Sequence, residues 1–379
     1  MNMNRNLLFS AALAASFTLF SCQSQAPQTT NGLVVIDIDN PNIKEPLPND
    51  QVIESATLIP LKGDFMFKHI DDMLFTNDRI FMLDNVNNAA EAIKIFDIDG
   101  NFIKFIRQGS GPGEIDHWSH WYWDEKVQKL YVYNTQTWTI FDKDGNFVEK
   151  REVPIKYYAM SRIGDEFAFH CTDYNVNDSL GNKFFITDTT FNIKYSAMKA
   201  MYKTSLLIVS PSERFFGQSN EAPWYVRADT VYNVQNTQLV PRYIFKYENR
   251  LSDSELEKDV ASLSEITGYI PGRYRDNGIT QTLNISTLTG KVNNYVVRDK
   301  KSGHYFVLNF NGSEEDRFPP FYLRATPCGN DWAVSIDDYS YNEYIPEIMP
   351  FVSESDKKLL EEFQVEDNPI IVKFKTKEF

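Results

Sequence analysis

Apolar residues in this chain come in short runs, and polar and turn residues separate the runs. The runs 79–83, 129–133 and 304–310 are of this kind. Short apolar runs of this length that are rich in aromatic and β-branched residues and bounded by turn residues are typical of β-strands. Two of the turns contain Asp-Gly, a strong hairpin signal, because Gly accepts the positive φ that a tight turn needs. The pattern predicts an all-β chain of antiparallel strands.

One strand-turn-strand segment is repeated. The segment Phe96–Phe102 (FDIDGNF) recurs 45 residues later as Phe141–Phe147 (FDKDGNF). Weaker copies, without the Asp-Gly pair, follow at 184–193, 225–234 and 331–336. Four antiparallel strands in about 40–50 residues is the size of a propeller blade. Counting the units predicts a six-bladed β-propeller of four-stranded antiparallel blades. Five or seven blades are the neighbouring counts, and a β-sandwich with accidental similarity is the alternative fold.

The first residues have the pattern of a lipoprotein leader. Arg5 precedes the apolar stretch 7–20, which has 14 residues and is too short to span a bilayer as a helix. Leu19-Phe20-Ser21-Cys22 then matches a lipobox. We therefore expect residues 1–21 to be a signal peptide, with cleavage before Cys22 and acylation of that residue. The alternative is an ordinary secretory signal in which the cysteine is incidental.

Residues 22–32 are polar and uncharged, and we expect them to form a flexible tether. Residues 33–379 then form a single propeller domain beside the lipid bilayer. Gln23 stands where an Asp commonly retains bacterial lipoproteins in the inner membrane, and the tether lacks the acidic run that directs some of them to the cell surface. The pattern favours the outer membrane, facing the periplasm, over the cell surface.

The composition and net charge narrow the classes of partner and cofactor that we expect. The chain is 42% hydrophobic and 14% aromatic, which suits a folded β-rich domain, and its net charge is −14. An acidic protein repels phosphate backbones, so we expect no nucleic-acid partner. Once Cys22 is acylated, Cys171 and Cys328 remain, and they fall in different predicted blades. We predict two separate thiols rather than a disulfide. No motif indicates a cofactor.

Several segments together resemble a known family. They are the lipobox, Thr57–Leu61, the Asp-Gly-Asn-Phe turn, Gln108–Glu114 (QGSGPGE), Asp229–Tyr232 and Asn368–Val372. The chain resembles the six-bladed β-propeller lipoproteins of Bacteroidota, which are similar to NHL- and TolB-type propellers. The resemblance covers the whole mature chain and implies the fold, but it implies no activity. It also implies that the last strand, 370–374, pairs with 57–61 to close the ring.

Two helical segments interrupt the strand pattern. The charged stretch 251–277 is predicted to be a helical insertion, with Ser252 as N-cap and Glu255 completing a capping box. A second helix is predicted over Glu354–Glu362, with Ser353 as its cap. Both are expected to lie over one rim of the ring.

Candidate ligand-binding residues cluster after the glycine-rich loop. Glu114 ends that loop, which either connects two blades or lines the mouth of the central channel. The segment 116–124 follows, holds the densest aromatic patch, and is predicted to be the innermost strand of the next blade. Exposed Trp and Tyr beside polar residues suit stacking on sugar rings, and packing between blades is the alternative. The ligand-binding candidates are Glu114, His117, Trp118, His120, Trp121, Trp123 and Arg324.

No metal site or catalytic set is predicted. His117 and His120 face opposite sides of a strand, with no third ligand near them. Counted from Asp97, Phe102 and Gln108 stand where an EF-hand loop needs Gly and Glu, so the Asp-Gly segments are predicted to be structural turns. No Walker A motif, nucleophile elbow or His-Glu-x-x-His motif is present. The catalytic residues stay unassigned.

These patterns favour a membrane-anchored propeller that binds a ligand, such as a glycan or another envelope protein, without catalysis. The alternative is a carbohydrate hydrolase or lyase that uses acidic and His residues at the central channel. A structural adaptor for an envelope protein is a third class. Ser179, Thr189 and Thr230 each follow an Asp in the short pattern of O-glycosylation in Bacteroidota, and whether they are modified is open.

Overall fold

The fold follows from a computed structural model. It describes residues 29–30, 32–65, 67, 70–84, 93–115, 120–134, 136–157, 159–171, 181–199, 213–216, 224–227, 229–248, 269–287, 293–310, 319–336, 340–363 and 368–379. The predicted signal peptide, Cys22 and the first part of the tether lie outside these residues, as do His117, Trp118, Ser179, Ser252 and Glu255.

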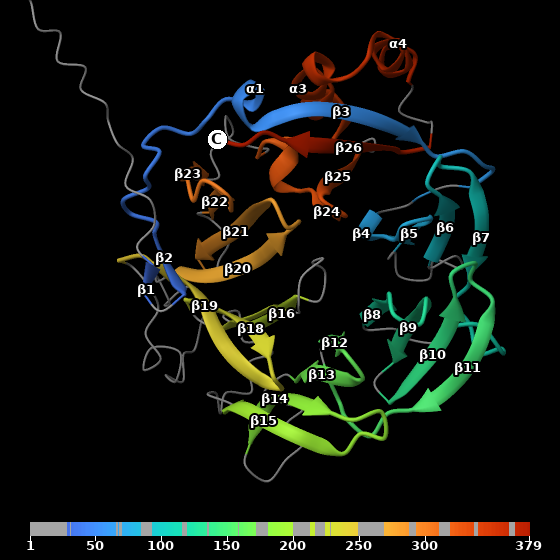
Figure 1. Cartoon of the computed structure of the whole chain (residues 1–379). Helices are drawn as coiled ribbons and strands as arrows, with labels where there is room; N and C mark the ends of the chain where they lie inside the picture. Colours follow the sequence, from blue (N-terminus) through green and yellow to red (C-terminus); the bar gives the residue numbers. More distant parts are fainter. Residues whose placement is uncertain are drawn as a thin grey trace, which may run out of the picture.

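Six sheets, each with four antiparallel strands that form a blade, surround a central axis, so the predicted six-bladed β-propeller is confirmed (Figure 1). Blade 1 is β4 (Ile70–Phe75), β5 (Arg79–Asp84), β6 (Ile93–Asp97) and β7 (Phe102–Ile106). Blade 2 is β8 (His120–Asp124), β9 (Lys129–Asn134), β10 (Thr137–Asp142) and β11 (Phe147–Glu152). Blade 3 is β12 (Ala159–Ile163), β13 (Glu166–His170), β14 (Asn182–Thr187) and β15 (Ile193–Lys199).

The other three blades complete the ring. Blade 4 is β16 (Glu213–Phe216), β17 (Trp224–Arg227), β18 (Thr230–Gln235) and β19 (Gln238–Lys246). Blade 5 is β20 (Tyr269–Asp276), β21 (Thr280–Thr287), β22 (Asn293–Asp299) and β23 (Tyr305–Phe310). Blade 6 is β24 (Thr326–Cys328), β25 (Asp331–Ile336), β26 (Ile370–Thr376) and β3 (Ile53–Pro60). In each blade the strand nearest the axis comes first in this order (Figure 1).

Blade 6 is built from both ends of the chain. β3 pairs antiparallel with β26, with Ile370 opposite Pro60 and Lys373 opposite Thr57. The pairing predicted for ring closure is therefore confirmed. It leaves no open gap between first and last blade, where exposed strand edges would otherwise invite aggregation.

A further N-terminal strand was not anticipated. β2 (Leu33–Asp37) adds to blade 4 as a parallel neighbour of β19, and β1 (Thr29–Thr30) pairs with β2, so the last residues of the predicted tether join a sheet. Ile36 is fully buried there, and the Tyr305 hydroxyl of blade 5 donates to the Asp37 carbonyl at 2.9 Å. The apolar run 33–36 is the sequence signal for this strand.

The repeated Asp segment is a side-chain-braced turn. Asp97 accepts hydrogen bonds from the backbone N–H groups of Asp99 (3.0 Å) and Asn101 (2.9 Å) and from the Asn101 amide (2.9 Å). Asp142 and Asp188 make the same set in the next two blades. A carboxylate that accepts several N–H bonds is stabilised in its ionised form. Partial burial opposes the effect at Asp97 and Asp142, and the hydrogen bonds still lower the pKa of all three carboxyls. These segments are structural turns, as predicted.

Each turn also docks on the blade before it. Lys62, just after β3, donates its backbone N–H to the Gly100 carbonyl at 2.8 Å and accepts from Phe102 N at 3.1 Å. Its ammonium reaches Asn101 Oδ1 at 3.5 Å, and Lys104 of β7 reaches Asn146 Oδ1 of blade 2 at 2.8 Å in the same way. The repeat is therefore the contact between blades.

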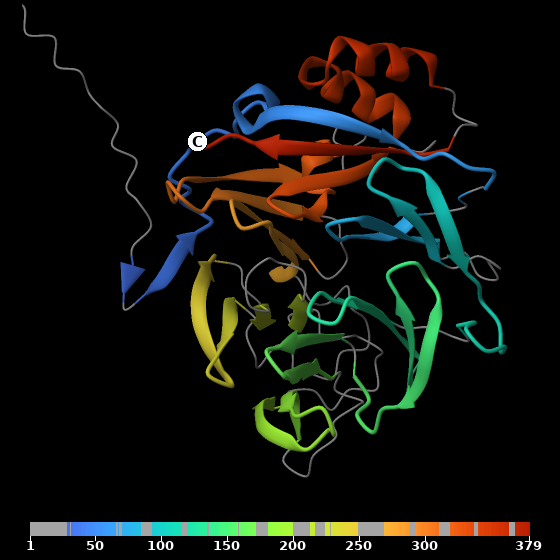
Figure 2. The ribbon, with the colours of Figure 1, turned by 45° about the vertical axis from the view of Figure 1, so that its right-hand side comes forward.

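Helices cap blade 6. α4 (Glu354–Glu362) has the predicted bounds, and Ser353 Oγ accepts from Asp356 N at 3.2 Å, which confirms the cap. α3 (Tyr341–Ile348), which was not predicted, precedes α4, and both lie on the outer side of β3 and β26 (Figure 2). The short helix α1 (Asn49–Val52) leads into β3.

The helical insertion predicted over 251–277 is wrong in its second part. Residues 269–276 form β20, the inner strand of blade 5, and residues 251–268 lie outside the described part of the chain. The charges of this stretch suggested a solvent-exposed helix. Instead Asp276 is fully buried, where it accepts from the Tyr274 hydroxyl (3.0 Å), Gln281 (3.1 Å) and Lys300 (3.1 Å). A buried charge is tolerated when it is paired and hydrogen-bonded in this way.

Gly100 offers a test of blade docking. Its φ is +79°, and a Cβ there would lie 2.2 Å from the Pro60 carbonyl oxygen of the neighbouring blade. We expect Gly100→Ala to lower the free energy of unfolding by about 3 kcal/mol, because backbone strain and an unyielding backbone contact add. Gly181→Ala, at φ +72° with nothing within 4 Å of the new Cβ, should cost only about 1 kcal/mol. Calorimetric melting of both variants measures the difference, and equal losses would contradict the docking role.

Candidate functional site

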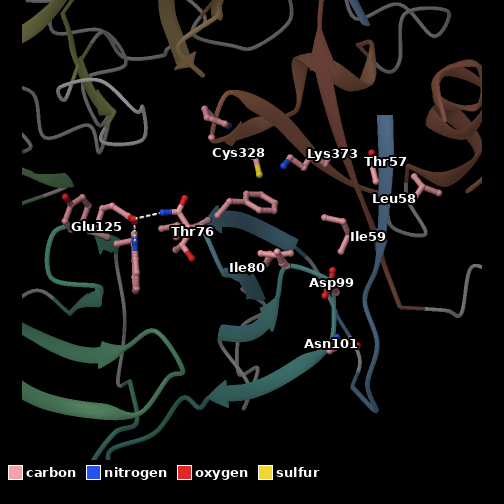
Figure 3. A pocket seen from close by; sticks show the side chains of 18 of the residues that line it. Thr57, Leu58, Ile59, Thr76, Ile80, Asp99, Asn101, Glu125, Cys328 and Lys373 are labelled. Atoms are coloured by element: carbon pink, nitrogen blue, oxygen red, sulfur yellow. Dashed lines mark hydrogen bonds between the residues drawn. The ribbon is translucent and has the colours of Figure 1, made fainter. Parts of the chain in front are cut away.

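A cavity of about 1290 Å³ opens on the face of the ring that carries the turns between the first and second strands of the blades. Blades 6, 1, 2 and 3 all contribute to its wall. Figure 3 shows the labelled side chains: Thr57, Leu58, Ile59 and Lys373 come from the outer strands of blade 6, Cys328 from its inner hairpin, Thr76 from blade 1 and Glu125 from blade 2. The cavity thus runs from the ring seam, which is the interface between blades 6 and 1, toward the central axis.

The turns that line the cavity are held by local hydrogen bonds. In blade 1, Thr76 N donates to the Arg79 carbonyl and Arg79 N donates back to Thr76 Oγ1, each at 2.9 Å. Arg79 also donates to Asp144 in the repeated turn of blade 2, from Nε at 2.9 Å and from Nη2 at 2.6 Å. These contacts fix the position of the neighbouring Asn77 relative to blade 2.

Glu125 is the best-positioned polar group of the wall. Its carboxylate accepts from Trp123 Nε1 at 2.6 Å and from Asn77 Nδ2 at 3.2 Å, so it bridges blades 1 and 2 (Figure 3). Glu125 itself is exposed, whereas Trp123 is only 8% exposed and packs on Phe81 at 5.4 Å between ring centroids. A buried indole therefore holds an exposed carboxylate in place.

Arg162 lines the same end of the cavity, but its charge serves the fold. Its Nε lies 2.5 Å from Asp124 Oδ2, and Asp124 is fully buried. The guanidinium also lies over the Phe167 ring, 4.8 Å from its centroid. This pair joins blade 2 to blade 3 and leaves little charge for a ligand.

The other end of the cavity is a cleft between blades 6 and 1, whose lining includes apolar residues and also Thr57, Lys62, Asp99, Asn101 and Lys373. Ile59, Phe75 and Cys328 form its wall and are half-buried against the apolar cluster that joins these blades. Ile98, in the repeated turn of blade 1, stands at the rim with 51% of its surface exposed. Lys373 flanks the cleft and lies 3.1 Å from Asp331.

Cys328 does not provide a reactive thiolate. Burial raises the pKa of its thiol to about 11, against a smaller opposing effect of the Lys373 charge. The thiolate is the nucleophilic form, so this group is protonated at neutral pH. Cys328 and Cys171 are not joined in a disulfide, as predicted.

The structure separates the residues proposed from the sequence. Glu114 Oε2 accepts from Gly111 N at 2.8 Å, inside its own loop. A Cβ at Gly113 would lie 2.9 Å from Phe147 of β11, the outermost strand of blade 2. The glycine-rich loop is therefore a connector at the outer edge of the ring and does not line the channel mouth, because β7, which it follows, is itself an outer strand.

The aromatic strand β8 divides its side chains between two blade interfaces, as its alternation predicts. Trp121 and Trp123 pack between blades 1 and 2, and Tyr122 packs between blades 2 and 3. Trp121 Nε1 donates to Asp72 Oδ2 at 2.9 Å. Among these three residues, Tyr122 and Trp123 also reach the cavity wall. Packing thus uses most of the aromatic surface.

His120 begins β8 at the opposite face from the cavity. Burial lowers the pKa of its imidazole to about 4. Burial also lowers the pKa of His170 to about 3, with smaller effects of the Lys183 and His120 charges. Both rings are neutral at neutral pH. His117 and Trp118 lie outside the described residues.

Arg324 lies apart from the other candidates. It ends the short helix η4 (Phe321–Leu323) in blade 6, is exposed, and lies beside the Tyr344 phenol of α3. The members of the predicted set that the structure describes are therefore spread over the ring, and of these Trp123 alone lies in the wall of the cavity. Ligand binding by these residues stays a prediction.

Sequence reasoning did not find Glu125, Asn77 or Lys373. Asn77 and Glu125 occupy the first hairpin turn of consecutive blades, which is the one signal the sequence offers. Of the glycosylation candidates, Thr189 is exposed in its turn and Thr230 is half-buried with its hydroxyl on Asp229 at 2.8 Å.

Two further observations bound the chemistry. Across the described residues, no group of three or more His, Cys, Asp or Glu side chains is placed to hold a metal ion. Within the same part of the chain, no helix is both long and apolar enough to cross a bilayer.

Comparison with known proteins adds a family and a fold. The model of a domain of unknown function, DUF4934, matches residues 33–375. A crystal structure of a candidate exported protein from Bacteroides fragilis superposes with a TM-score of 0.69 at 16% identity, over 91% of this chain and 100% of that one. The extracellular domain of a candidate one-component system from Bacteroides thetaiotaomicron gives a TM-score of 0.34 at 11% identity, over 71% and 33% of the two chains, which is too low to support an argument. No curated protein matches the sequence.

Alkylation of Cys328 tests the character of the cavity wall. Because its pKa is raised to about 11, the rate with iodoacetamide should climb about tenfold per pH unit between pH 8 and pH 10 without levelling. A cysteine-containing peptide as control should level above about pH 8.5. Peptide mapping by mass spectrometry separates Cys328 from Cys171, which should react only after unfolding. A plateau for Cys328 below pH 9 would contradict the burial argument.

Proposed function

The chain belongs to the DUF4934 family, whose function is unknown, and we propose that it is an envelope-anchored β-propeller that binds a ligand or partner without catalysing a reaction. The observation that carries this proposal is the cavity of about 1290 Å³ that opens across four blades on one face of the ring. A concave site with a few fixed polar groups and an apolar wall is what a binding protein needs.

The chemistry of the wall supports binding over catalysis. Arg162 and Lys373 are each held by a carboxylate from the protein, and Cys328 is protonated at neutral pH. Glu125 accepts hydrogen bonds from two neutral donors, Trp123 and Asn77. A carbohydrate hydrolase or lyase, the alternative, needs a carboxylic acid poised to donate a proton beside a second carboxylate. Among the described residues of the wall, the groups that hold Glu125 are an indole and an amide, and neither is a second carboxylate.

The anchor belongs to the same proposal. The lipobox that ends at Cys22 supports cleavage and acylation there, and the first strand that joins a blade of the ring, β2, begins at Leu33. The domain would then sit beside the outer membrane, facing the periplasm, on a tether of about ten residues. Its partners there are the lipid bilayer and either a glycan or another envelope protein.

Removal of Cys22 tests the anchor. In cells of the native host, Cys22→Ala should move the protein from the membrane pellet to the soluble fraction, because one acylated residue carries the whole attachment. Cys328→Ala is the matched control and should stay with the membranes. The intact mass of the native protein should begin at residue 22 and carry acyl groups. Retention of the Cys22→Ala protein in the pellet after a high-salt wash would refute the lipid anchor.

Occlusion of the cavity tests the binding function. The full chain is assayed for equilibrium binding against two probe sets, soluble polysaccharides and a display library of linear peptides. Thr57→Trp places a bulky ring at an exposed position of the wall and should weaken any bound probe about tenfold. Ser55→Trp lies on the same strand, is exposed and falls outside the wall, so it should bind like the native protein. Binding that is equal in both variants, or no binding in either set, would refute the proposed site.

A further inference from the structure

We propose that the cavity receives an extended, basic segment of a partner protein, whose cationic group docks on Glu125 and whose apolar side chains fill the cleft between blades 6 and 1. This inference rests on the proposed binding function and names the class of its ligand. Four properties of the wall carry it: the pairing of its charges, the fixed position of Glu125, its division into two ends, and its size.

The charges of the wall are unevenly paired. Arg162 is neutralised by Asp124 and Lys373 by Asp331, whereas the Lys62 ammonium reaches two neutral oxygens, the Asp99 carbonyl at 3.4 Å and Asn101 Oδ1 at 3.5 Å. The Glu125 carboxylate is also held by neutral partners, Trp123 and Asn77. Its charge is therefore one that a ligand can compensate, as is that of Asp99, an exposed carboxylate at the other end of the wall, and a carboxylate attracts an ammonium or guanidinium group.

The position of Glu125 adds to this argument. One carboxylate oxygen accepts a hydrogen bond from Trp123 of blade 2, and the other accepts one from Asn77 of blade 1 (Figure 3). These two bonds orient the carboxylate before any ligand arrives. A preoriented charged group loses little conformational entropy on binding. The net charge of the chain, −14, also favours the approach of a cationic partner over an anionic one.

Apolar side chains gather at the end of the cavity between blades 6 and 1. Glu125 and Asn77 mark the end near the axis, whereas Ile59, Phe75 and the half-exposed Ile98 mark the cleft at the ring seam. A ligand that fits both ends carries its cation and its apolar groups at separate places along its length. A peptide segment with basic and aliphatic side chains has this form.

The aromatic rings of the wall disfavour a sugar. Stacking on a sugar needs an exposed ring face. Trp123 is 8% exposed and packs on Phe81, and the Tyr122 hydroxyl already accepts from Arg162 N at 2.9 Å. Phe75 is half-buried in the cluster at the ring seam. The described rings of the wall therefore give no free stacking platform.

The size of the cavity favours a chain segment over a small amine. At about 1290 Å³ it exceeds the roughly 300–1,000 Å³ of small-molecule pockets, and it crosses four blades. An extended segment can contact all four blades at once, whereas an alkylamine can reach only one end.

The test uses the full chain in detergent and three probe sets: a display library of random linear peptides, soluble polysaccharides, and straight-chain alkylamines. We expect the enriched peptides to combine Lys or Arg with aliphatic residues. Glu125→Gln should lower the affinity for these peptides about tenfold, because a charge pair is lost. For the same reason the affinity should depend less on salt concentration. Glu149→Gln, an exposed position on the outer strand of blade 2 outside the cavity, should change the affinity less than about twofold.

A second pair of variants tests the apolar end. Ile98→Ser should lower the affinity for the same peptides about fivefold, because it removes exposed apolar surface at the rim of the cleft. Ile193→Ser is the matched control, since Ile193 is 46% exposed against 51% for Ile98 and lies on β15, outside the wall. Melting curves of all four variants check that the fold is retained.

Each other outcome has one meaning. Neutral or acidic peptides, equal losses in Glu125→Gln and Glu149→Gln, or binding of alkylamines alone would overturn the basic-segment inference and leave the cavity as a binding site. Binding of polysaccharides alone, sensitive to Thr57→Trp, would overturn the inference and support the proposed function. Binding of no probe in any set would overturn both.

Discussion

The antiparallel pairing of β3 with β26 is the contact on which the rest of the structure depends. It joins the beginning and the end of the domain in one blade, and it buries Ile370, Ile371 and Val372 almost completely. Without it, blade 6 loses its outer strand and blade 1 loses the neighbour on which its repeated turn docks. The cavity depends on the same pairing, because its apolar cleft lies at the seam between blades 6 and 1. Fold and candidate site therefore share one structural origin.

Docking between blades repeats one chemical device. In blades 1 and 2, a buttressing Asp braces the turn between the third and fourth strands, a glycine lets the turn approach the preceding blade, and a Lys from that blade bonds to the Asn of the turn. The device recurs because each blade has the same problem, a sheet face that only a neighbour can cover. The repeated residues are consequently structural, and the positions that differ between blades are free to make a site.

Most charges near the cavity are already used by the protein. Arg79 binds Asp144, Arg162 binds Asp124 and Lys373 binds Asp331, and the first two of these pairs join neighbouring blades. Pairs of this kind position elements without offering reactive groups. Glu125 differs from these three pairs because neutral donors hold it, and Asp99 is a second exposed carboxylate of the wall. A surface that only holds blades together has its charges paired within the protein, whereas a surface that recognises a ligand keeps a charge that the ligand can pair. This difference matters more than the number of polar groups.

The sequence by itself determined the elements whose causes are local. Short apolar runs and Asp-Gly turns predicted the strands and the blade count, and the Ser353 cap predicted α4 with its bounds. Predictions from local patterns failed where packing against distant residues decides the structure. β20 is a strand in spite of its charges, because blade 5 buries and pairs Asp276. β2 joins blade 4 only because β19 offers a free edge. The packing of the blades around the axis brings together Asn77, Trp123 and Glu125. The same packing places Glu114 at the outer edge of the ring. Tertiary structure alone decided these, because neighbours across a blade interface have no fixed spacing along the chain.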